Sequence, residues 1–578
     1  MLGATMPGRL PRPAAPPLVC LLLLSLAARG ARGVCETGSA HECQAAEFVP
    51  GAQLAGEGYD VVTLRTTGAF VVDVDAWRNA NGSCMLCRNG LLGGARQRLP
   101  LALVDWRAQS SCRRALSSQL YRSAAELVET ADSALTNDWR ADLRLPVRPN
   151  AGVQLVLAGS HSKVVTFGTD RARSDRYSFT SQGFQCLYYR YRVREQPPLA
   201  PDFDRALTHL PGELTNASRP LYRQLVATYG THYLRSVQLG GSLRDVTAFR
   251  TCKLASGGFT AEEAKDCLKL EATATVEGVV NAGAGFNRCR EMARSLGGAA
   301  KVHQVLGDRE TVVRGGRAQQ GRDLFFGAGG AAVFARWADS LPAQPGAVSY
   351  ALAPLHHLLP ASHPARESLR RYLGEYVGAN ALLQQCGRGV PCPAGSYRDP
   401  RRPCSCLCRE GGGLDRSCCP REKGLGRLVV TVKEGRDLWG DVFSGTDGYA
   451  VVRYGQAQAR TPVVWNNNNP NWDAELDLGT VQLTSGHRLT VEVWDSERRG
   501  RDDLLGSCQR PQLTAGSNPQ VCYLKYGKVS YAVSLTCLPH LGGSTCQDYA
   551  PRPDGTAFGP LLPAARPSRT PPLAVVYP

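Results

Sequence analysis

An export signal followed by twenty cysteines constrains the fold of this chain more than any other feature of its sequence. Two arginines precede an apolar run of 11 residues, Leu18 to Ala28, and small residues follow it, which predicts a signal peptide at residues 1–33. The run is too short to span a bilayer. Its removal takes away Cys20 and leaves 20 of the 21 cysteines. An exported chain with so many cysteines is expected to be held together by disulfides, and a cytosolic or nuclear protein is excluded.

The chain is basic, since 67 lysines and arginines face 50 acidic residues and give a net charge of +17. This charge favours an anionic partner, either nucleic acid or an acidic membrane surface. Because the chain is exported, no nucleic acid is expected. No second stretch of about 18 apolar residues is present, so no further membrane-spanning helix is expected. Asn81 and Asn216 begin Asn-x-Ser sequons, which predict glycans on exposed surface.

The character of the sequence changes along the chain and predicts four parts after the signal peptide. Residues 34–375 combine helical and strand patterns and read as one large mixed domain. Residues 376–425 hold seven cysteines, as in an epidermal-growth-factor-like module; zinc is the alternative, which export disfavours. Residues 426–537 read as an all-β sandwich. Residues 538–578 form a C-terminal extension that is rich in proline and expected to be disordered beyond 550.

The spacing of the cysteines leaves most of the disulfide connectivity open. Local bridges are plausible between Cys508 and Cys522 and between Cys537 and Cys546. Six of the seven cysteines of the module can pair internally, and the seventh must pair elsewhere. The other candidates for disulfides are Cys35, Cys43, Cys84, Cys87, Cys112, Cys186, Cys252, Cys386, Cys392, Cys404, Cys406, Cys408, Cys418 and Cys419.

Periodicity in the large domain predicts its elements. Residues 111–135 and 207–225 show helical periods, and residues 184–193 alternate as a strand. The capping box at 260–263 starts a helix, whereas residues 268–277 alternate as a strand over ten positions. Opposed signals in one segment suit an element with two conformations. The alternative is an ordinary half-buried strand after a helix.

Two acidic loops of the β domain carry the most specific chemical signal. The first contains Asp441 and Asp447, and the second contains Asp495, Glu497, Asp502 and Asp503. Both loops follow strands, so the carboxylates converge if the loops lie at the same end of a sandwich. Calcium suits such a set because it accepts six to eight oxygen ligands in loose geometry. Crowding is expected to raise the pKa values of these carboxyls without calcium, so acid would release the ion.

This region resembles a C2 domain. The segments that carry the resemblance are 437–441, 446–449, 465–472 and 493–495. The resemblance implies two or three calcium ions that bridge the protein to lipid headgroups, with Trp439 inserting into the membrane interface. Two features depart from the family pattern. Glu497 replaces the usual Asp, which would weaken one ion site, and arginines at 498, 499 and 501 would favour anionic headgroups.

The segment Tyr229-Gly230-Thr231-His232-Tyr233 follows a predicted helix and leads into a strand, and Gly240-Gly241 permits a bend downstream. With residues 323–327, 337–341 and 350–355, these segments resemble the membrane-attack-complex/perforin (MACPF) family. The order of the three modules is that of its perforin members. The resemblance implies an α+β fold of the MACPF and cholesterol-dependent-cytolysin type, with a bent central sheet and flanking helical clusters. A small disulfide-rich module and an all-β C2 sandwich would follow.

In this family two helical clusters refold into membrane-crossing hairpins, here expected at about 158–185 and 253–312. The resemblance implies a secreted, calcium-dependent pore former that docks on lipid headgroups, assembles with itself into a ring and inserts a β-barrel. Such a protein kills target cells and admits granule proteases, and it is not an enzyme. Its expected places are the lumen of cytotoxic granules and then the plasma membrane of the target cell.

Two disulfides bear on this expectation. The resemblance implies a bond between Cys252 and Cys419 that ties the large domain to the cysteine-rich module. Cys267 and Cys289 have no obvious partners except each other, and a bridge between them would limit how far the second hairpin opens.

Two other classes of protein compete with a pore former. A non-lytic adhesion or signalling protein would keep the same domains and lose the pore. A secreted hydrolase using His232 is disfavoured, because no nucleophile motif accompanies this histidine.

Overall fold

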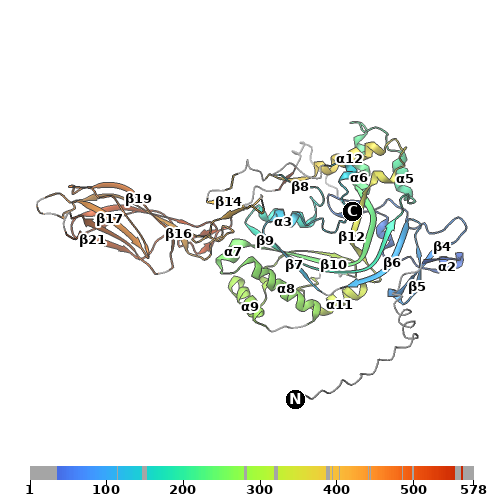
Figure 1. The fold of residues 1–578 in the computed structure, drawn as a ribbon, viewed down its shortest axis with the longest axis horizontal. Coiled ribbons are helices and arrows are strands. Elements are labelled where there is room, and N and C mark those ends of the chain that lie inside the picture. Colours follow the sequence, from blue (N-terminus) through green and yellow to red (C-terminus); the bar gives the residue numbers. More distant parts are fainter. Residues whose placement is uncertain are drawn as a thin grey trace, which may run out of the picture.

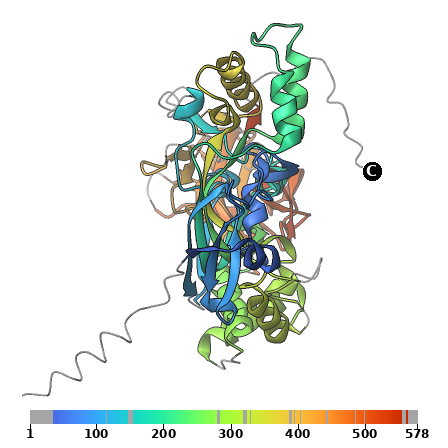
Figure 2. The same ribbon diagram turned by 90° about the vertical axis from the view of Figure 1, so that its right-hand side faces the viewer.

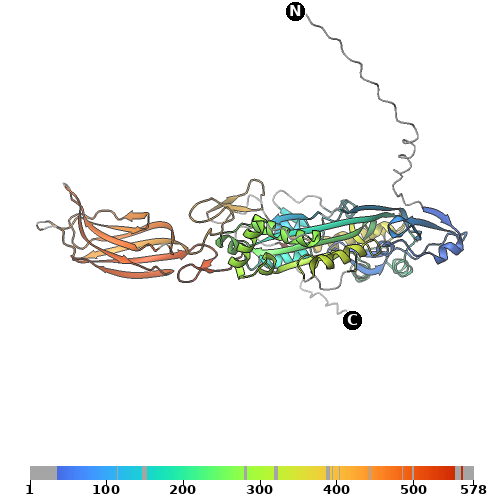
Figure 3. The same ribbon diagram turned by 90° about the horizontal axis from the view of Figure 1, so that it is seen from below.

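The computed structural model describes residues 35–563, except for 113–114, 146–152, 279–282, 318–322, 328, 386–390, 393–394, 403, 441, 443, 485, 498–499 and 554–560. The predicted signal peptide, Cys386, Asp441, Arg498 and Arg499 therefore lie outside the described residues. The molecule is long and flat, with a large mixed domain at one end and a β-sandwich at the other (Figures 1 and 3).

A bent sheet of eight strands forms the centre of the large domain. Its two longest strands, β9 (Tyr177–Val193) and β10 (His232–Arg250), pair along most of their length. The other strands of this sheet are β2 (Glu57–Asp60), β3 (Arg65–Phe70), β6 (Leu103–Cys112), β7 (Ser117–Tyr121), β11 (Asp308–Arg314) and β12 (Gly346–Pro354). The α+β fold with a bent central sheet, predicted from the sequence, is confirmed.

The pairing of β10 is irregular at Gly240 and Gly241, the two glycines that the sequence predicts to permit a bend. The pairing of β10 with β9 shifts in register between Leu239 and Gly240. A Cβ on Gly240 would lie 1.9 Å from the carbonyl oxygen of Cys186, and one on Gly241 would lie 2.3 Å from the Leu341 side chain. At Gly240, only glycine leaves room for the neighbouring backbone.

Helices cover both ends of the sheet (Figures 1 and 2). At the end near β12 lie α5 (Pro201–Thr208), α6 (Arg219–Tyr229) and α12 (Arg366–Ala379). At the other end lie α3 (Ala124–Val128), α4 (Lys163–Ala172), α7 (Thr251–Ser256), α8 (Ala261–Glu277), α9 (Ala284–Gly297), α10 (Val302–Val305) and α11 (Gly330–Ser340). These helices pack on small separate apolar clusters, of which one lies between α8 and α9 and another around α3 and α4. The helices of this second group therefore contribute less to the main core than the sheet does, whereas α5, α6 and α12 form part of that core.

Small sheets complete the large domain. The first joins β1 (Cys35–Gly38), β4 (Cys84–Asn89) and β5 (Ala95–Leu99), beside helix α2 (Ala40–Ala45). The second joins β8 (Val153–Val156), β13 (Leu382–Gln385) and β26 (Leu562–Pro563). Because β26 pairs with β13 and Leu561 is buried, the expectation of disorder beyond 550 is wrong for residues 561–563.

Three local predictions differ from the structure. The helix expected over 111–135 is replaced by the end of β6, by β7 and by the short α3. The helix expected over 207–225 is two helices, α5 and α6, with a turn between them. Residues 268–277 are helical throughout, within α8, so the alternative of an ordinary strand there is wrong for this state.

Nine disulfides join described cysteines. They are Cys35–Cys87, Cys43–Cys84, Cys112–Cys186, Cys252–Cys419, Cys267–Cys289, Cys392–Cys406, Cys408–Cys418, Cys508–Cys522 and Cys537–Cys546. Cys404 is also disulfide-bonded. Cys84 and Cys87 bond to different partners, which gives this Cys-x-x-Cys motif a structural role rather than a redox role.

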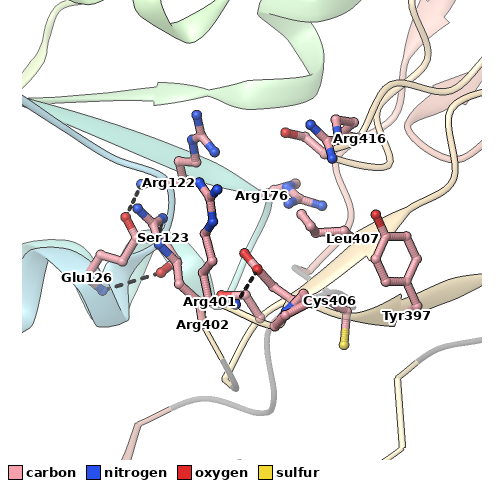
Figure 4. A pocket seen from close by; sticks show the side chains of 14 residues that line it. Arg122, Ser123, Glu126, Arg176, Tyr397, Arg401, Arg402, Cys406, Leu407 and Arg416 are labelled. Carbon is pink, nitrogen blue, oxygen red and sulfur yellow. Dashed lines mark hydrogen bonds and ion pairs between the residues drawn. The ribbon is translucent and has the colours of Figure 1, made fainter.

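The cysteine-rich module contains one hairpin, β14 (Ser396–Arg398) with β15 (Cys406–Cys408). It meets the large domain at a cavity of about 460 Å³ (Figure 4). Arg122 and Arg176 line the cavity from the large domain, and three arginines line it from the module. One of these, Arg402, forms an ion pair with Glu126 of α3. An ion pair and the bond from Cys252 to Cys419 therefore fix the module to the large domain.

The β-sandwich consists of two four-stranded sheets. One sheet has the order β19 (Asn471–Gln482), β16 (Leu425–Arg436), β23 (Lys528–Cys537) and β22 (Gly516–Tyr523). The other has the order β18 (Ala457–Arg460), β17 (Gly448–Tyr454), β20 (Leu489–Asp495) and β21 (Asp503–Arg510). Alternate residues of both sheets fill the core between them. A final hairpin, β24 (Leu541–Gly542) with β25 (Asp548–Tyr549), returns toward the large domain.

Within the described residues, no helix is both long enough and apolar enough to cross a bilayer.

Candidate functional site

The ends of β17, β20 and β21 bring predicted calcium ligands to one edge of the sandwich. Gly448 pairs with Asp495, and Asp495 pairs with Asp503. Asp447 immediately precedes β17, and its backbone N–H donates to Asp495 Oδ1 at 2.7 Å. The two acidic loops therefore meet at one end of the sandwich.

The backbone around Asp447 and Asp495 is tightly fitted. A Cβ on Gly440 would lie 1.7 Å from Asp495 Oδ2, so only glycine lets the first loop pass this carboxylate. The N–H of Asn466 donates to Asp447 Oδ1 at 2.6 Å, which brings a third loop to the same edge. These contacts fix the first loop against the second.

Asp502 has its own partners within the second loop. The Tyr449 hydroxyl donates to Asp502 Oδ2 at 2.6 Å, and the Glu497 N–H donates to Asp502 Oδ1 at 3.0 Å. These hydrogen bonds lower the pKa of Asp502. Burial, with the adjacent carboxylate, raises the pKa of Tyr449 to about 12. The expectation that crowding raises the pKa values of these carboxyls is therefore wrong for Asp502.

The donor set fits a hard cation. It consists of carboxylate oxygens, which calcium prefers, and lacks the sulfur and nitrogen ligands typical of zinc. Asp441 lies outside the described residues, and the side chains that are described include no group of three that is arranged to hold a metal. Calcium binding by this edge stays a prediction.

Large apolar side chains are exposed at the same edge. Trp439 is 51% exposed, and its ring packs edge-on against Tyr526 at 5.4 Å. Val442 in the same loop and Trp465 beside Asn466 are also exposed. Neither residue was among the membrane contacts predicted from the sequence, although an apolar residue within a loop of Asn, Gly and Ser is a signal for such a contact.

The segment 229–233 has a structural role. Gly230 adopts φ +75°, and a Cβ there would lie 2.6 Å from the backbone of Tyr59. His232 is fully buried against the Trp139 ring at 4.9 Å, and burial lowers its pKa to about 3. Its Nδ1 lies 2.7 Å from the Thr231 hydroxyl. A neutral histidine enclosed in the core is no base for a soluble substrate.

Comparison with known proteins agrees with this architecture. The MAC/Perforin domain family matches residues 48–385, and the C2 domain family matches residues 426–522. Perforin-1 of Homo sapiens is 41% identical over 522 residues, which cover 90% of this chain and 93% of that protein. The chain belongs to the MAC/Perforin family.

Perforin-1 of Mus musculus is 39% identical over 539 residues, which cover 92% of this chain and 97% of that protein. A solved structure of a C2 domain is 35% identical and covers 19% of this chain and 98% of its own, with a TM-score of 0.17. As a MAC/Perforin protein with a C2 domain, the chain forms pores and binds membranes through that C2 domain.

The segments expected to refold in this family lie beside the central sheet. The second, expected at 253–312, contains α8, α9 and α10 and the start of β11. The first was expected at 158–185, but residues 177–185 already belong to β9. Only the part before Tyr177, which includes α4, is therefore available to change from helix to strand.

Proposed function

We propose that this protein docks on membranes through calcium held by its C2 loops, assembles with copies of itself and inserts strands that close into a barrel. The pore kills target cells and admits granule proteases, and no covalent catalysis is involved. Before release, the protein is stored in the lumen of cytotoxic granules. The observation that carries the proposal is the meeting of Asp447, Asp495 and Asp503 at the edge that exposes Trp439.

The proposed ligands are Asp441, Asp447, Asp495, Glu497, Asp502 and Asp503. Bound calcium supplies positive charge that joins these carboxylates to lipid phosphates. Trp439 and Val442 then enter the interface beside the ion, because an exposed apolar side chain gains free energy when it leaves water. Arg501 is exposed in the second loop and adds attraction to anionic headgroups.

The helices proposed to refold lie next to sheet strands in the chain. Helix α7 begins at Thr251, directly after β10 ends at Arg250, and β11 follows α10. Helix α4 ends at Ala172, shortly before β9 begins. Straightening these segments lengthens strands that already exist, so the existing ladder guides the new pairs. A closed barrel then satisfies the backbone in lipid.

Leakage of liposomes tests this proposal. We expect the wild-type protein to release a trapped dye only with calcium, and Asp447→Ala to abolish both binding and release. Glu475→Ala, which removes a carboxylate from an exposed strand position, is the matched control and should leak like the wild type.

The result also separates the rival function. Calcium-dependent binding without leakage would favour the non-lytic adhesion protein. If neither binding nor leakage needs Asp447, the calcium site proposed here is wrong.

A further inference from the structure

The second refolding segment contains a disulfide that is in register with the strand ladder beside it. β10 and β11 pair antiparallel without a slip, from Ser242 opposite Arg314 to Ala248 opposite Asp308. In such a ladder each step forward on one strand is a step back on the other. Continued from Ala248 and Asp308 by equal steps, the ladder places Cys267 opposite Cys289.

These two cysteines are bonded in the present structure, where they join α8 to α9 (Figure 1). Their Cα atoms are 5.5 Å apart. Directly opposed residues in an antiparallel ladder have Cα atoms about 4.5–5.5 Å apart, which a disulfide spans. The same bond therefore suits the helix pair and the continued ladder.

Between the sheet and the bridge, the continued register matches opposite charges. It places Glu262 opposite Arg294, Lys265 opposite Glu291, and Asp266 opposite Arg290. Opposed charges stabilise a ladder and like charges destabilise it. A shift of this register by one residue would instead oppose like charges. Lys265 would face Arg290 in one direction, and Asp266 would face Glu291 in the other.

The helices in the present structure use other partners. Arg288 contacts Glu263 at 2.9 Å and Glu291 at 3.0 Å, and Lys265 contacts Asp266 at 3.2 Å. The charge pairs of the continued ladder are therefore a property of the sequence that the resting helices do not explain.

Beyond the bridge, the first pair sets Leu268 opposite Arg288, and from the second pair onward the register matches residues of similar polarity. It places Leu270 opposite Phe286 and Lys269 opposite Asn287, and this agreement of polarity continues along the sequence as far as Val276. Residues 268–277 alternate over ten positions, and a membrane-crossing strand needs about 9–11 residues. The midpoint between the two cysteines is Gly278, whose φ of +69° shows a glycine already in a turn conformation.

We infer that the Cys267–Cys289 bond sets the register of the second membrane-inserting hairpin and stays closed in the pore. Residues 268–277 form one membrane-crossing arm, and Gly278 lies at the tip. The inference rests on the proposed function. It also replaces the expectation that this bridge limits how far the hairpin opens, because an in-register bond leaves both arms beyond it free to extend.

A charge exchange across the ladder tests the register. Asp266→Arg alone puts two arginines opposite each other in every subunit of the ring, so leakage should fall by about tenfold. The exchange Asp266→Arg with Arg290→Asp should restore leakage to within about threefold of the wild type. The matched control, Asp266→Arg with Lys301→Asp, changes the same charges but uses an exposed position that the register places opposite Ala255. It leaves position 266 opposite Arg290 and should not recover.

Two further measurements keep the outcomes distinct. All these positions are exposed, so monomer melting temperature and calcium-dependent binding to liposomes should match the wild type. Peptides from membrane-extracted oligomers, digested without reductant, should retain Cys267 bonded to Cys289. Equal leakage of the exchange and its control, or recovery of these cysteines unbonded, would overturn the register. A wild-type protein that binds and never leaks would instead overturn the proposed function.

Discussion

Asp245 is a buried carboxyl in the central sheet. Thr247 and Thr311 donate their hydroxyls to it, at 3.1 Å and 2.7 Å, and the charged side chains that act on it are Arg309 and Asp323. Burial dominates these contacts and raises the pKa of Asp245 to about 6. In the unfolded chain the carboxyl returns to its ordinary value of about 3.9.

The sign of the pH effect follows from this shift. Between the two pKa values the folded protein binds more protons than the unfolded chain, so stability falls as the pH rises through this window. The loss amounts to up to about 3 kcal/mol of unfolding free energy at neutral pH. This carboxyl therefore makes the resting fold more stable in an acidic compartment than at neutral pH.

Replacing Asp245 with Asn removes the titration and keeps the shape. We expect Asp245→Asn to melt at a higher temperature than the wild type at pH 7 and at a similar temperature near pH 4.5. Asp339→Asn, at an exposed position, should keep the pH dependence of the wild type. A wild-type melting temperature that stays level between pH 4.5 and pH 7 would contradict the assignment.

At the scale of elements, the hairpin β24–β25 holds the chain between α4 and β9. Asp175 lies there, fully buried, and accepts hydrogen bonds from the Tyr549 hydroxyl at 2.7 Å and the Arg552 N–H at 3.1 Å. His540 Nδ1 is 3.3 Å from the same carboxylate. The C-terminal extension thus binds the end of the first refolding segment.

Tyr549→Phe removes one donor from this buried carboxylate and keeps the ring. The change should cost about 1–3 kcal/mol of unfolding free energy, because the lost hydrogen bond leaves a buried oxygen less satisfied. We expect a lower melting temperature and faster calcium-triggered leakage. Tyr523→Phe, which removes an exposed hydroxyl, should change neither, and an unchanged melting temperature for Tyr549→Phe would show that the hairpin does not restrain this segment.

Secondary structure could be predicted best where the spacing of apolar residues fits only a strand or only a helix. The C2 strands alternate cleanly and are bounded by loop residues, so their positions and the acidic loops could be foreseen. Leu116 and Leu120 are four apart, a spacing that fits one face of a helix and also one face of a strand. Residues 117–121, which include Leu120, pair with β9 and form β7. The helical state of α8 depends on the apolar cluster that it shares with α9. These contacts join residues far apart in the sequence, so the pattern within residues 261–277 could not predict them.

At the scale of the whole molecule, the loops proposed to dock and the helices proposed to insert lie far apart. The C2 loops lie at the free end of the sandwich, and the refolding helices flank the sheet (Figure 1). The cysteine-rich module lies between them, and Cys419 bonds Cys252 in α7, at the start of the second refolding segment. Attachment at the membrane therefore reaches this segment through a covalent link.

Cutting that link should separate binding from perforation. The double change Cys252→Ala and Cys419→Ala opens a loop with a sequence separation of 167 residues and should lower the stability of the large domain by about 4–5 kcal/mol. The C2 sandwich keeps its own core and its bonds from Cys508 to Cys522 and from Cys537 to Cys546, so calcium-dependent binding should persist. Leakage should fall steeply, because the module no longer holds α7 in place while neighbouring subunits align. Cys508→Ala with Cys522→Ala is the converse control. It removes a disulfide of the C2 sandwich, so it should weaken calcium-dependent binding before it affects the large domain. If the double variant binds and leaks like the wild type at a temperature where it remains folded, docking and insertion communicate by another route.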